Sequence, residues 1–450
     1  MKQIDFGNGS IGKCVMQSAG PMLVAQVLNL MYSIVDRIYI GKIQNTGMIA
    51  LGGIGLCFPV IIIITAFTNL YGTGGAPLCA MARGKGDDQR AEKIMNTAFR
   101  LLLVTALIIT VLGEIFCCPL LFLFGASEVT IGYAVPYMRI YLIGTAASMI
   151  SAGLNPFITA QGYSFAGMLT VFIGTIANII LDPVFIFVFR MGVSGAAIAT
   201  VISQCISAFF VLLFLIRSKA ELKLHKKMQW DGSLALDIIS LGTAGFVMQC
   251  TNSLVSIVCN HVLSIYGGDI YVSAMTIITS VRQILDTPVM AVGEGTSPVL
   301  SYNYGAGKFK RVCSAIRLNT IIGVGYTAAA WILIILFPAG FIGIFNNDQS
   351  LLKIAVPALH AYFFAFVFQA LQYSGQTVFK SLNKKRRAIF FSLFRKVIMV
   401  IPLTILLPRF AGLGAQGVFI AEPVSNFIGG SACFITMLVT LIPELKDAKH

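Results

Sequence analysis

The chain has 450 residues, of which 57% are hydrophobic and only 11% are charged, and its mean hydropathy is +0.85. This composition excludes a soluble globular protein and predicts an integral membrane protein with many spans. The formal net charge of +14 does not indicate a nucleic-acid partner, because the basic residues gather in short loops between apolar segments. The expected surroundings are therefore a lipid bilayer.

Twelve hydrophobic segments follow one another along the chain, and each is long enough for a transmembrane helix. They lie at approximately 14–40, 48–81, 94–124, 131–156, 163–189, 193–217, 235–265, 269–304, 312–342, 352–379, 389–409 and 413–443. We therefore expect an all-α integral membrane protein with twelve transmembrane helices.

Basic residues are concentrated in the connections that follow the even-numbered segments, whereas the other connections hold few of them. The residues concerned are Arg83, Lys85, Arg90, Lys93, Arg217, Lys219, Lys223, Lys226, Lys227, Lys308, Lys310, Arg311, Lys384, Lys385, Arg386 and Arg387. By the positive-inside rule these connections lie in the cytoplasm. We therefore expect a multi-pass protein of the inner (plasma) membrane with both termini in the cytoplasm.

The first segment carries an acid, Asp36, near its end. Before it, Cys14 to Val35 form 22 residues without a formal charge, which is enough helix to cross the hydrocarbon core. A carboxylate that faces lipid there costs about 2.5–3.5 kcal/mol, so we expect Asp36 to face a polar cavity or a partner. It is interpreted either as a proton or cation site, or as an interfacial acid that pairs with the neighbouring Arg37.

An internal repeat divides the chain into two halves. At an offset of 221 residues, GTGGAPLCAMARGKGDDQR (72–90) lies over GEGTSPVLSYNYGAGKFKR (293–311). At an offset of 222, GVSGAAIATVISQ (192–204) lies over the end of GLGAQGVFIAEPVSN (412–426), with Gly192 paired to Gly414. Six spans per half that enter from the same side form parallel repeats, which are typical of secondary transporters. We expect an amino-terminal six-helix lobe at 1–217, a cytoplasmic linker at 218–233 and a carboxy-terminal six-helix lobe at 234–450.

The two halves differ in their acids. SIVD (33–36) pairs with SIVC (256–259), so Cys259 stands where the first half has Asp36. Around residue 400 the second half has IPLT, where the first half has NIILDP (178–183) with Asp182. Only the first half therefore has this pair of membrane acids.

Other polar residues of the first half share helix faces with these acids. Asn178 and Asp182 are four residues apart on the fifth helix, and Tyr137 and Asn155 are 18 apart on the fourth. With Thr200 on the sixth helix they could form an oxygen-rich pocket for a hard monovalent cation or for a shared proton. The alternative, favoured for Thr200 and Tyr137 taken singly, is ordinary interhelical hydrogen bonding.

Together these motifs resemble the multidrug and toxic compound extrusion (MATE) family, with the MepA-like bacterial branch as the nearest part of it. The resemblance covers nearly the whole chain and is carried by VDRIYIG, GTGGAP with its repeat partner, LNPFITAQG (154–162), NIILDP, GVSGAAIATVISQ and SYNYGAGKFKR. It implies two six-helix lobes around a V-shaped central cavity. It also implies alternating access driven by an inward gradient of Na⁺ or H⁺, with no cofactor besides the coupling ion.

The resemblance also implies roles for individual residues. Asp36, Asn178, Asp182 and Thr200 match the family's cation-coupling site, which would hold the Na⁺ if that is the coupling ion. Tyr137 and Asn155 would lie close to that site, and Pro21 matches a position at which the first helix is proposed to bend. Some members carry an acid on the seventh helix. The segment 235–265 has Gln249 and, after Asp237 at its very start, no acid, so the resemblance does not extend to coupling through that helix.

Candidate substrate-binding residues lie in the second half. Arg282, Asp286, Met290 and Glu294 follow one another at steps of four along the eighth helix, where Arg282 could neutralise Asp286. Glu294 stands between two glycines, so an acid in that position could attract cationic drugs. Glu294, Met290 and Gln249 are therefore the expected substrate contacts.

Several functions remain open at this point. The first is efflux of amphipathic organic cations by antiport with H⁺ or Na⁺, by a protein that we expect to be a monomer. The second is a lipid-linked oligosaccharide flippase of the same superfamily, which should have a more cationic cavity, whereas the core of this chain reads as net acidic. A membrane-embedded enzyme is not expected, because HExxH, GxSxG and DDxxD motifs are missing. A channel is a further alternative.

Overall fold

The computed structural model describes residues 3–41, 43, 47–217, 221–225, 231–345, 349–410 and 412–447. Every regular element within these ranges is a helix. By internal contacts the chain divides into two compact units. The amino-terminal unit comprises Met1–Asp5 and Gly20–Phe246, and the carboxy-terminal unit comprises Phe6–Ala19 and Val247–His450. The lobe and linker boundaries expected from the sequence stay a prediction.

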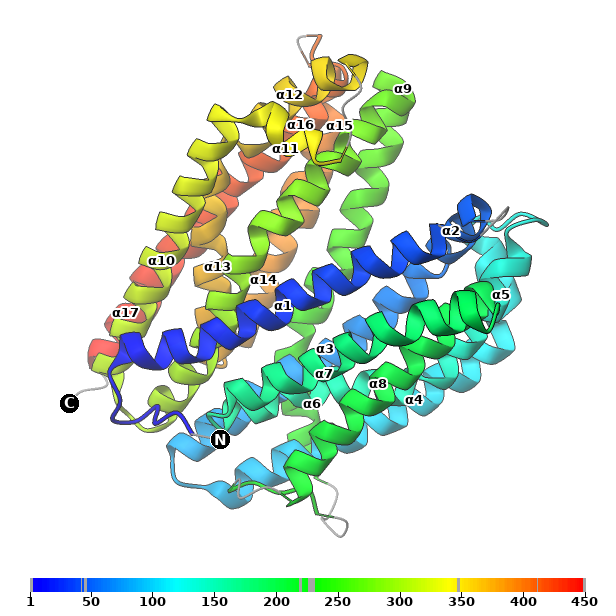
Figure 1. Ribbon diagram of the computed structural model, residues 1–450. Coiled ribbons are helices and arrows are strands. Elements are labelled where there is room, and N and C mark those ends of the chain that lie inside the picture. The colour runs from blue at the N-terminus through cyan, green and yellow to red at the C-terminus, as the bar shows by residue number, and fades with distance from the viewer. Residues whose placement is uncertain are drawn as a thin grey trace. The chain divides into compact units, whose positions relative to one another are not determined.

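The helices of the first half are shown from blue to green in Figure 1. They are α1 (Ile11–Gly41), α2 (Gly47–Gly55), α3 (Phe58–Gly84), α4 (Asp88–Leu123), α5 (Ile131–Ile143), α6 (Thr145–Ala160), α7 (Ser164–Pro183), η1 (Val184–Val188) and α8 (Gly192–Arg217). Within the unit α3 packs against α4 and α6, and α7 packs against α8. The backbones of α3 and α6 approach closely, because a Cβ added to Gly72 would lie 2.8 Å from the carbonyl oxygen of Gly153.

The second half begins with one long element, α9 (Gly232–Gly305), and continues to the red C-terminal helix of Figure 1. The remaining elements are α10 (Phe309–Leu336), α11 (Pro338–Gly343), α12 (Gln349–Phe363), α13 (Phe366–Ser381), α14 (Lys385–Leu393), η2 (Phe394–Val400), α15 (Ile401–Leu406), η3 (Leu407–Arg409), α16 (Ala415–Ser425), η4 (Asn426–Gly430) and α17 (Ser431–Asp447). Within its unit α13 packs against α10 and α17.

Each of the twelve expected segments is mainly helical, and several are interrupted by a short turn. The seventh and eighth lie together in α9, which turns at Gly268, where φ is 68° and ψ is −168°. In the part of the chain that the structure describes, nine helices are long and apolar enough to cross a membrane, and the bent pairs α5–α6 (56°) and α12–α13 (46°) bring the number to eleven. The stretch of α9 after Gly268 is not among them; it carries Arg282, Asp286 and Glu294.

The helix boundaries repeat with the sequence. α3 ends at Gly84 and α4 begins at Asp88, whereas α9 ends at Gly305 and α10 begins at Phe309, which is the same turn 221 residues later. Both turns contain a glycine in the left-handed region, Gly86 with φ 77° and its counterpart Gly307 with φ 68°. The two-repeat architecture predicted from the sequence is confirmed.

The segment after α8 is bound to the amino-terminal unit. The amide of Leu222 donates to Gln161 Oε1 at 3.3 Å, and the amide of Lys223 donates to Glu92 Oε1 at 2.9 Å. The Leu222 side chain is buried in the core of this unit. Residues 218–220 and 226–230 of the expected linker 218–233 lie outside the described residues.

Candidate functional site

Three polar side chains meet between α7 and α8 in the amino-terminal unit. Asn178 and Asp182 lie on successive turns of α7, and the Asn178 amide donates to Asp182 Oδ1 at 3.2 Å. The same amide lies 3.5 Å from Thr200 Oγ1 on α8. All three residues are buried. The i, i+4 spacing predicted from the sequence therefore places Asn178 and Asp182 side by side, and Thr200 joins them.

Helix α1 adds two further groups to this cluster. The Tyr32 hydroxyl lies 3.3 Å from Thr200 Oγ1. Asp36, one helical turn later and half-buried, is close enough to Asp182 for the two carboxylates to interact, and it also lies near the neutral hydroxyls of Tyr137 and Tyr32. Tyr32 was missed in the sequence, although its position four residues before Asp36 puts it on the same helix face.

On α7, Asn178 Oδ1 and Asp182 Oδ2 are buried without a hydrogen-bond partner among the described residues. A buried oxygen left in this way costs about 1–3 kcal/mol, more when it is charged. Carboxylate, amide and hydroxyl oxygens are the ligands that hard cations prefer, and a carboxylate oxygen can also take a proton. The cluster therefore fits either Na⁺ or H⁺ as a transported ion. In the described ranges no group of three or more His, Cys, Asp or Glu residues is placed to hold a metal.

The backbone at Asp182 departs from a regular helix. Pro183 follows it and has no N–H to donate, and the next residues form a π-helical turn, η1. Such turns are frequent at functional sites. Gly195 of α8 packs against this turn, since a Cβ there would lie 2.7 Å from the Phe185 carbonyl. The end of α7 is thereby held against α8, with Asp182 facing Asn178.

Asn155 makes its contacts elsewhere. Its amide donates to the Gly167 carbonyl and to Thr170 Oγ1, both at 2.8 Å, and so ties α6 to α7. The helix expected at 131–156 is bent by 56° between α5 and α6, so a shared face of Tyr137 and Asn155 does not follow from helical periodicity. Tyr137 is buried near Asp36, whereas the role of Asn155 in coupling stays a prediction.

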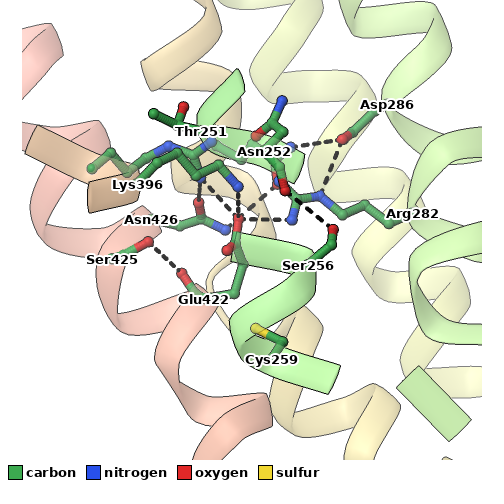
Figure 2. A network of polar contacts seen from close by, with 12 residues as sticks. Thr251, Asn252, Ser256, Cys259, Arg282, Asp286, Lys396, Glu422, Ser425 and Asn426 are labelled. Atoms are coloured by element: carbon green, nitrogen blue, oxygen red, sulfur yellow. Dashed lines mark hydrogen bonds and ion pairs between the residues drawn. The ribbon is translucent and has the colours of Figure 1, made fainter. Parts of the chain in front are cut away.

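The carboxy-terminal unit contains a buried network of charged groups (Figure 2). One oxygen, Glu422 Oε1 of α16, receives three cationic donors: Arg282 Nη1 at 2.7 Å, Arg395 Nη1 at 2.9 Å and Lys396 Nζ at 3.0 Å. Arg282 comes from α9, and the other two come from the π-helical segment η2. Gly429 makes room for Arg395, because a Cβ there would lie 3.1 Å from Arg395 Cγ.

The second acid of the network, Asp286, lies on α9 one turn from Arg282. It accepts from Arg282 Nε at 3.2 Å, from Gln369 Nε2 at 2.8 and 2.9 Å, and from the Tyr373 hydroxyl at 3.3 Å. The expected neutralisation of Asp286 by Arg282 is confirmed. Asn426 also belongs to this network, because its Oδ1 accepts a hydrogen bond from Arg395 Nη1 at 2.6 Å.

Sequence reasoning missed the two basic residues of this network. Arg395 and Lys396 lie inside the apolar segment 389–409, and two adjacent basic residues there are a signal that could have been used. Together with Arg282 they supply three positive charges, against two negative charges from Asp286 and Glu422. The expectation of a net acidic core is therefore wrong for the carboxy-terminal unit.

The repeat relates the two polar centres. Cys259 Sγ lies 3.7 Å from Thr404 Oγ1, and these residues occupy the positions of Asp36 and Asp182 in the first half. The counterpart of Thr200, at the offset of 222, is Glu422. Cys259 and Thr404 are therefore an uncharged pair at the positions where the first half has two acids. The charged side chains of the second half, including Glu422, lie at neighbouring positions.

The expected substrate residues all lie on α9. Glu294 is exposed and interacts electrostatically with Lys380 of α13, a basic partner that the sequence had not indicated. Met290, one turn earlier, is 37% exposed, and Gln249 is half-buried. Their contact with a substrate stays a prediction.

Comparison with known proteins agrees with this architecture. The MatE family profile matches residues 21–184 and 245–406. Multidrug export protein MepA of Staphylococcus haemolyticus is 25% identical over 427 residues, covering 94% of this chain and 93% of the relative. The MepA protein of Staphylococcus aureus strain MRSA252 is 23% identical, with 91% and 90% covered. A crystal structure of a MATE protein in the bent conformation has the same fold, with a TM-score of 0.93, 21% identity and 100% of both chains covered. Because the profile matches both halves, this chain belongs to the MatE family of membrane transporters.

Proposed function

We propose that this protein is a secondary active multidrug exporter of the plasma membrane, which expels amphipathic organic cations by antiport with H⁺ or Na⁺. Family membership and the names of the MepA relatives support export of drugs. Ion coupling is supported by one observation: the buried oxygens Asn178 Oδ1 and Asp182 Oδ2 lack a hydrogen-bond partner among the described residues.

The proposed coupling site consists of Asp36, Asn178, Asp182 and Thr200. Two carboxylates close together in a poorly polarisable interior repel each other, so the site gains a proton or a cation readily. Loading with H⁺ or Na⁺ removes that repulsion and satisfies the two buried oxygens. The empty and loaded sites then stabilise different arrangements of α1, α7 and α8, which is the differential interaction that antiport requires.

For substrate binding we propose Glu294 and Met290, which lie one turn apart and exposed on α9, together with Gln249. The carboxylate attracts cationic ligands, and the flexible thioether of Met290 adapts to varied apolar shapes. The charge of Lys380 lies close enough to interact with that of Glu294, so a cationic ligand would compete with Lys380 for the carboxylate. No partner other than small molecules and lipid is proposed.

For the conformational change we propose bending of α1 at Pro21. α1 runs through this proline as one helix, and the division of the chain into its two units falls between Ala19 and Gly20. Pro21 removes a backbone hydrogen bond at that point. We also propose that both termini and the linker are cytoplasmic, as the distribution of basic residues indicates.

Flipping of a lipid-linked oligosaccharide is the second candidate function. It is favoured by one observation, the excess of buried cationic groups around Glu422, since a pyrophosphate carrier needs cationic donors. Cation export is preferred because all three cationic side chains already bind the Glu422 carboxylate.

The test is transport of a dye cation by proteoliposomes under an imposed H⁺ or Na⁺ gradient. Asp36→Asn keeps the side-chain shape but cannot bind a proton or supply a charge, so we expect it to abolish gradient-driven export while the protein remains folded. Asp88→Asn is the matched control, because Asp88 is exposed in the first turn of α4. Export against a gradient by the Asp36→Asn protein would refute the coupling role. Failure of wild-type protein to move the dye under either gradient would refute the proposed function.

A further inference from the structure

The charges around Glu422 do not balance. Arg282, Arg395 and Lys396 carry three positive charges when protonated, and Asp286 and Glu422 carry two negative ones. At most 13% of any of these five side chains is exposed. A net charge in such a place is costly because it has been removed from water without a partner. The extra positive charge is therefore held weakly, and the network can release it readily as a proton.

Lys396 is the cation that can lose its charge. A guanidinium is not deprotonated in proteins, whereas a lysine amine gives up its proton when it is buried among other cations. Lys396 Nζ shares Glu422 Oε1 with both guanidinium groups, and Arg395 is its neighbour in η2. A neutral Lys396 amine can still donate its hydrogen bond of 3.0 Å to Glu422. Deprotonation therefore removes repulsion without breaking the contact.

The other groups around Lys396 do not offer an alternative proton carrier. Arg282 and Cys259 face it from α9, Glu422 from α16, and Asn426, at the start of η4, binds its neighbour Arg395. Tyr362 of α12 and Tyr373 of α13 contact Arg282 and Asp286 instead. Glu422 is held in its charged form by its three donors, since protonating it would leave Arg395 and Lys396 without an anion among the described residues (Figure 2).

We propose that Lys396 releases its proton when a cationic substrate binds and regains it afterwards, so that the carboxy-terminal unit has a proton site of its own. In this step an N–H bond of the ammonium breaks, the electron pair stays on Nζ, and the proton passes to water. The network goes from one net positive charge to none, and the arriving cation takes over the charge that leaves. Binding of the proton and of the substrate then oppose each other reciprocally, as antiport requires. The proposal rests on the proposed cation export and adds a second coupling position to it.

The test measures protons released by purified full-length protein when tetraphenylphosphonium binds, with a pH indicator in weak buffer. The background is Asp36→Asn/Asp182→Asn, which removes the titrating acids of the amino-terminal unit. We expect this protein still to release a proton on binding, and we expect the release to vanish when Lys396→Arg is added. Lys396→Arg keeps the positive charge and the hydrogen bond to Glu422, so the network stays intact while deprotonation is prevented. Lys396→Gln, which is neutral throughout, should also release none.

Two outcomes would overturn the proposal: no proton release from the background protein that retains Lys396, or undiminished release after Lys396→Arg. A second readout needs no substrate. Over the neutral pH range, potentiometric titration should show wild-type protein taking up one proton more than Lys396→Arg, and equal uptake would count against the proposal. Dye export by the wild-type protein is measured in parallel, so a failure of the proposed function is distinguished from a failure at Lys396.

Discussion

Replacement of Glu422 by glutamine should destabilise the protein strongly. Glu422→Gln keeps the size of the side chain but removes the only anion that Arg395 and Lys396 contact among the described residues. Three cationic groups would then remain with Asp286 as their single acid, and Asp286 is bound to Arg282 alone among them. Removing one partner of a buried ion pair costs about 3–5 kcal/mol, because the other charge stays buried without compensation. We expect the loss of unfolding free energy in Glu422→Gln to lie at the upper end of that range. The loss is smaller if Lys396 becomes neutral.

The matched control is Glu444→Gln in the same unit. Glu444 pairs with Lys384, but 43% of its side chain is exposed, so water screens the contact. Exposed ion pairs are worth about 0–1 kcal/mol, and the control should therefore change stability little. The measurement is the unfolding midpoint of each purified protein in the same detergent. Equal midpoints for Glu422→Gln and Glu444→Gln would show that the network does not hold the unit together. Adding Lys396→Gln to Glu422→Gln should recover part of the loss, and a double mutant that is no better than Glu422→Gln would contradict the charge count.

Gly72→Ala should lower the free energy of unfolding by about 1–3 kcal/mol, because the added methyl group would strike the Gly153 carbonyl. The control Gly132→Ala, whose methyl group would meet nothing within 4 Å, should be neutral or slightly stabilising. Equal unfolding midpoints for the two variants would refute this packing argument. Lys223→Cys, in a background without native cysteines, should react with an impermeant maleimide only after cells are opened, and labelling of intact cells would reverse the proposed topology. Glu294→Gln should weaken export of dications more than of monovalent cations and spare neutral substrates; an equal loss for all substrates would assign Glu294 to the fold or to coupling.

The helices and the repeat could be predicted because their signals are local. Hydropathy marks each span, and the glycines near 86 and 307 mark equivalent turns. The grouping of Asn178, Asp182 and Thr200 followed from helical spacing together with the resemblance. The spans, the turns and the pairing of Asn178 with Asp182 depend on neighbours in sequence, so composition and periodicity reveal them, whereas Thr200 was added to the site by the resemblance.

The network around Glu422 could not be predicted in the same way. Which side chains meet there depends on how α9, η2 and α16 are rotated about their axes, and the π-helical turns of η2 change that rotation within the helix. No residue pattern in the apolar segment 389–409 predicts a π-helical turn. The shared helix face of Tyr137 and Asn155 could not be derived for a related reason, because periodicity along one straight helix does not hold across the 56° bend between α5 and α6.

The burial of Leu222 bears on how the protein is made. Leu222, Leu234 and Ile238 all belong to the core of the amino-terminal unit, yet they follow the last helix of the first six. A nascent chain that has just completed α8 therefore lacks part of the apolar surface that closes this core. The first half can finish folding only after the ribosome has added the start of α9. For the same reason, a split version of the protein expressed as two polypeptides should be divided after Phe246 rather than after Arg217.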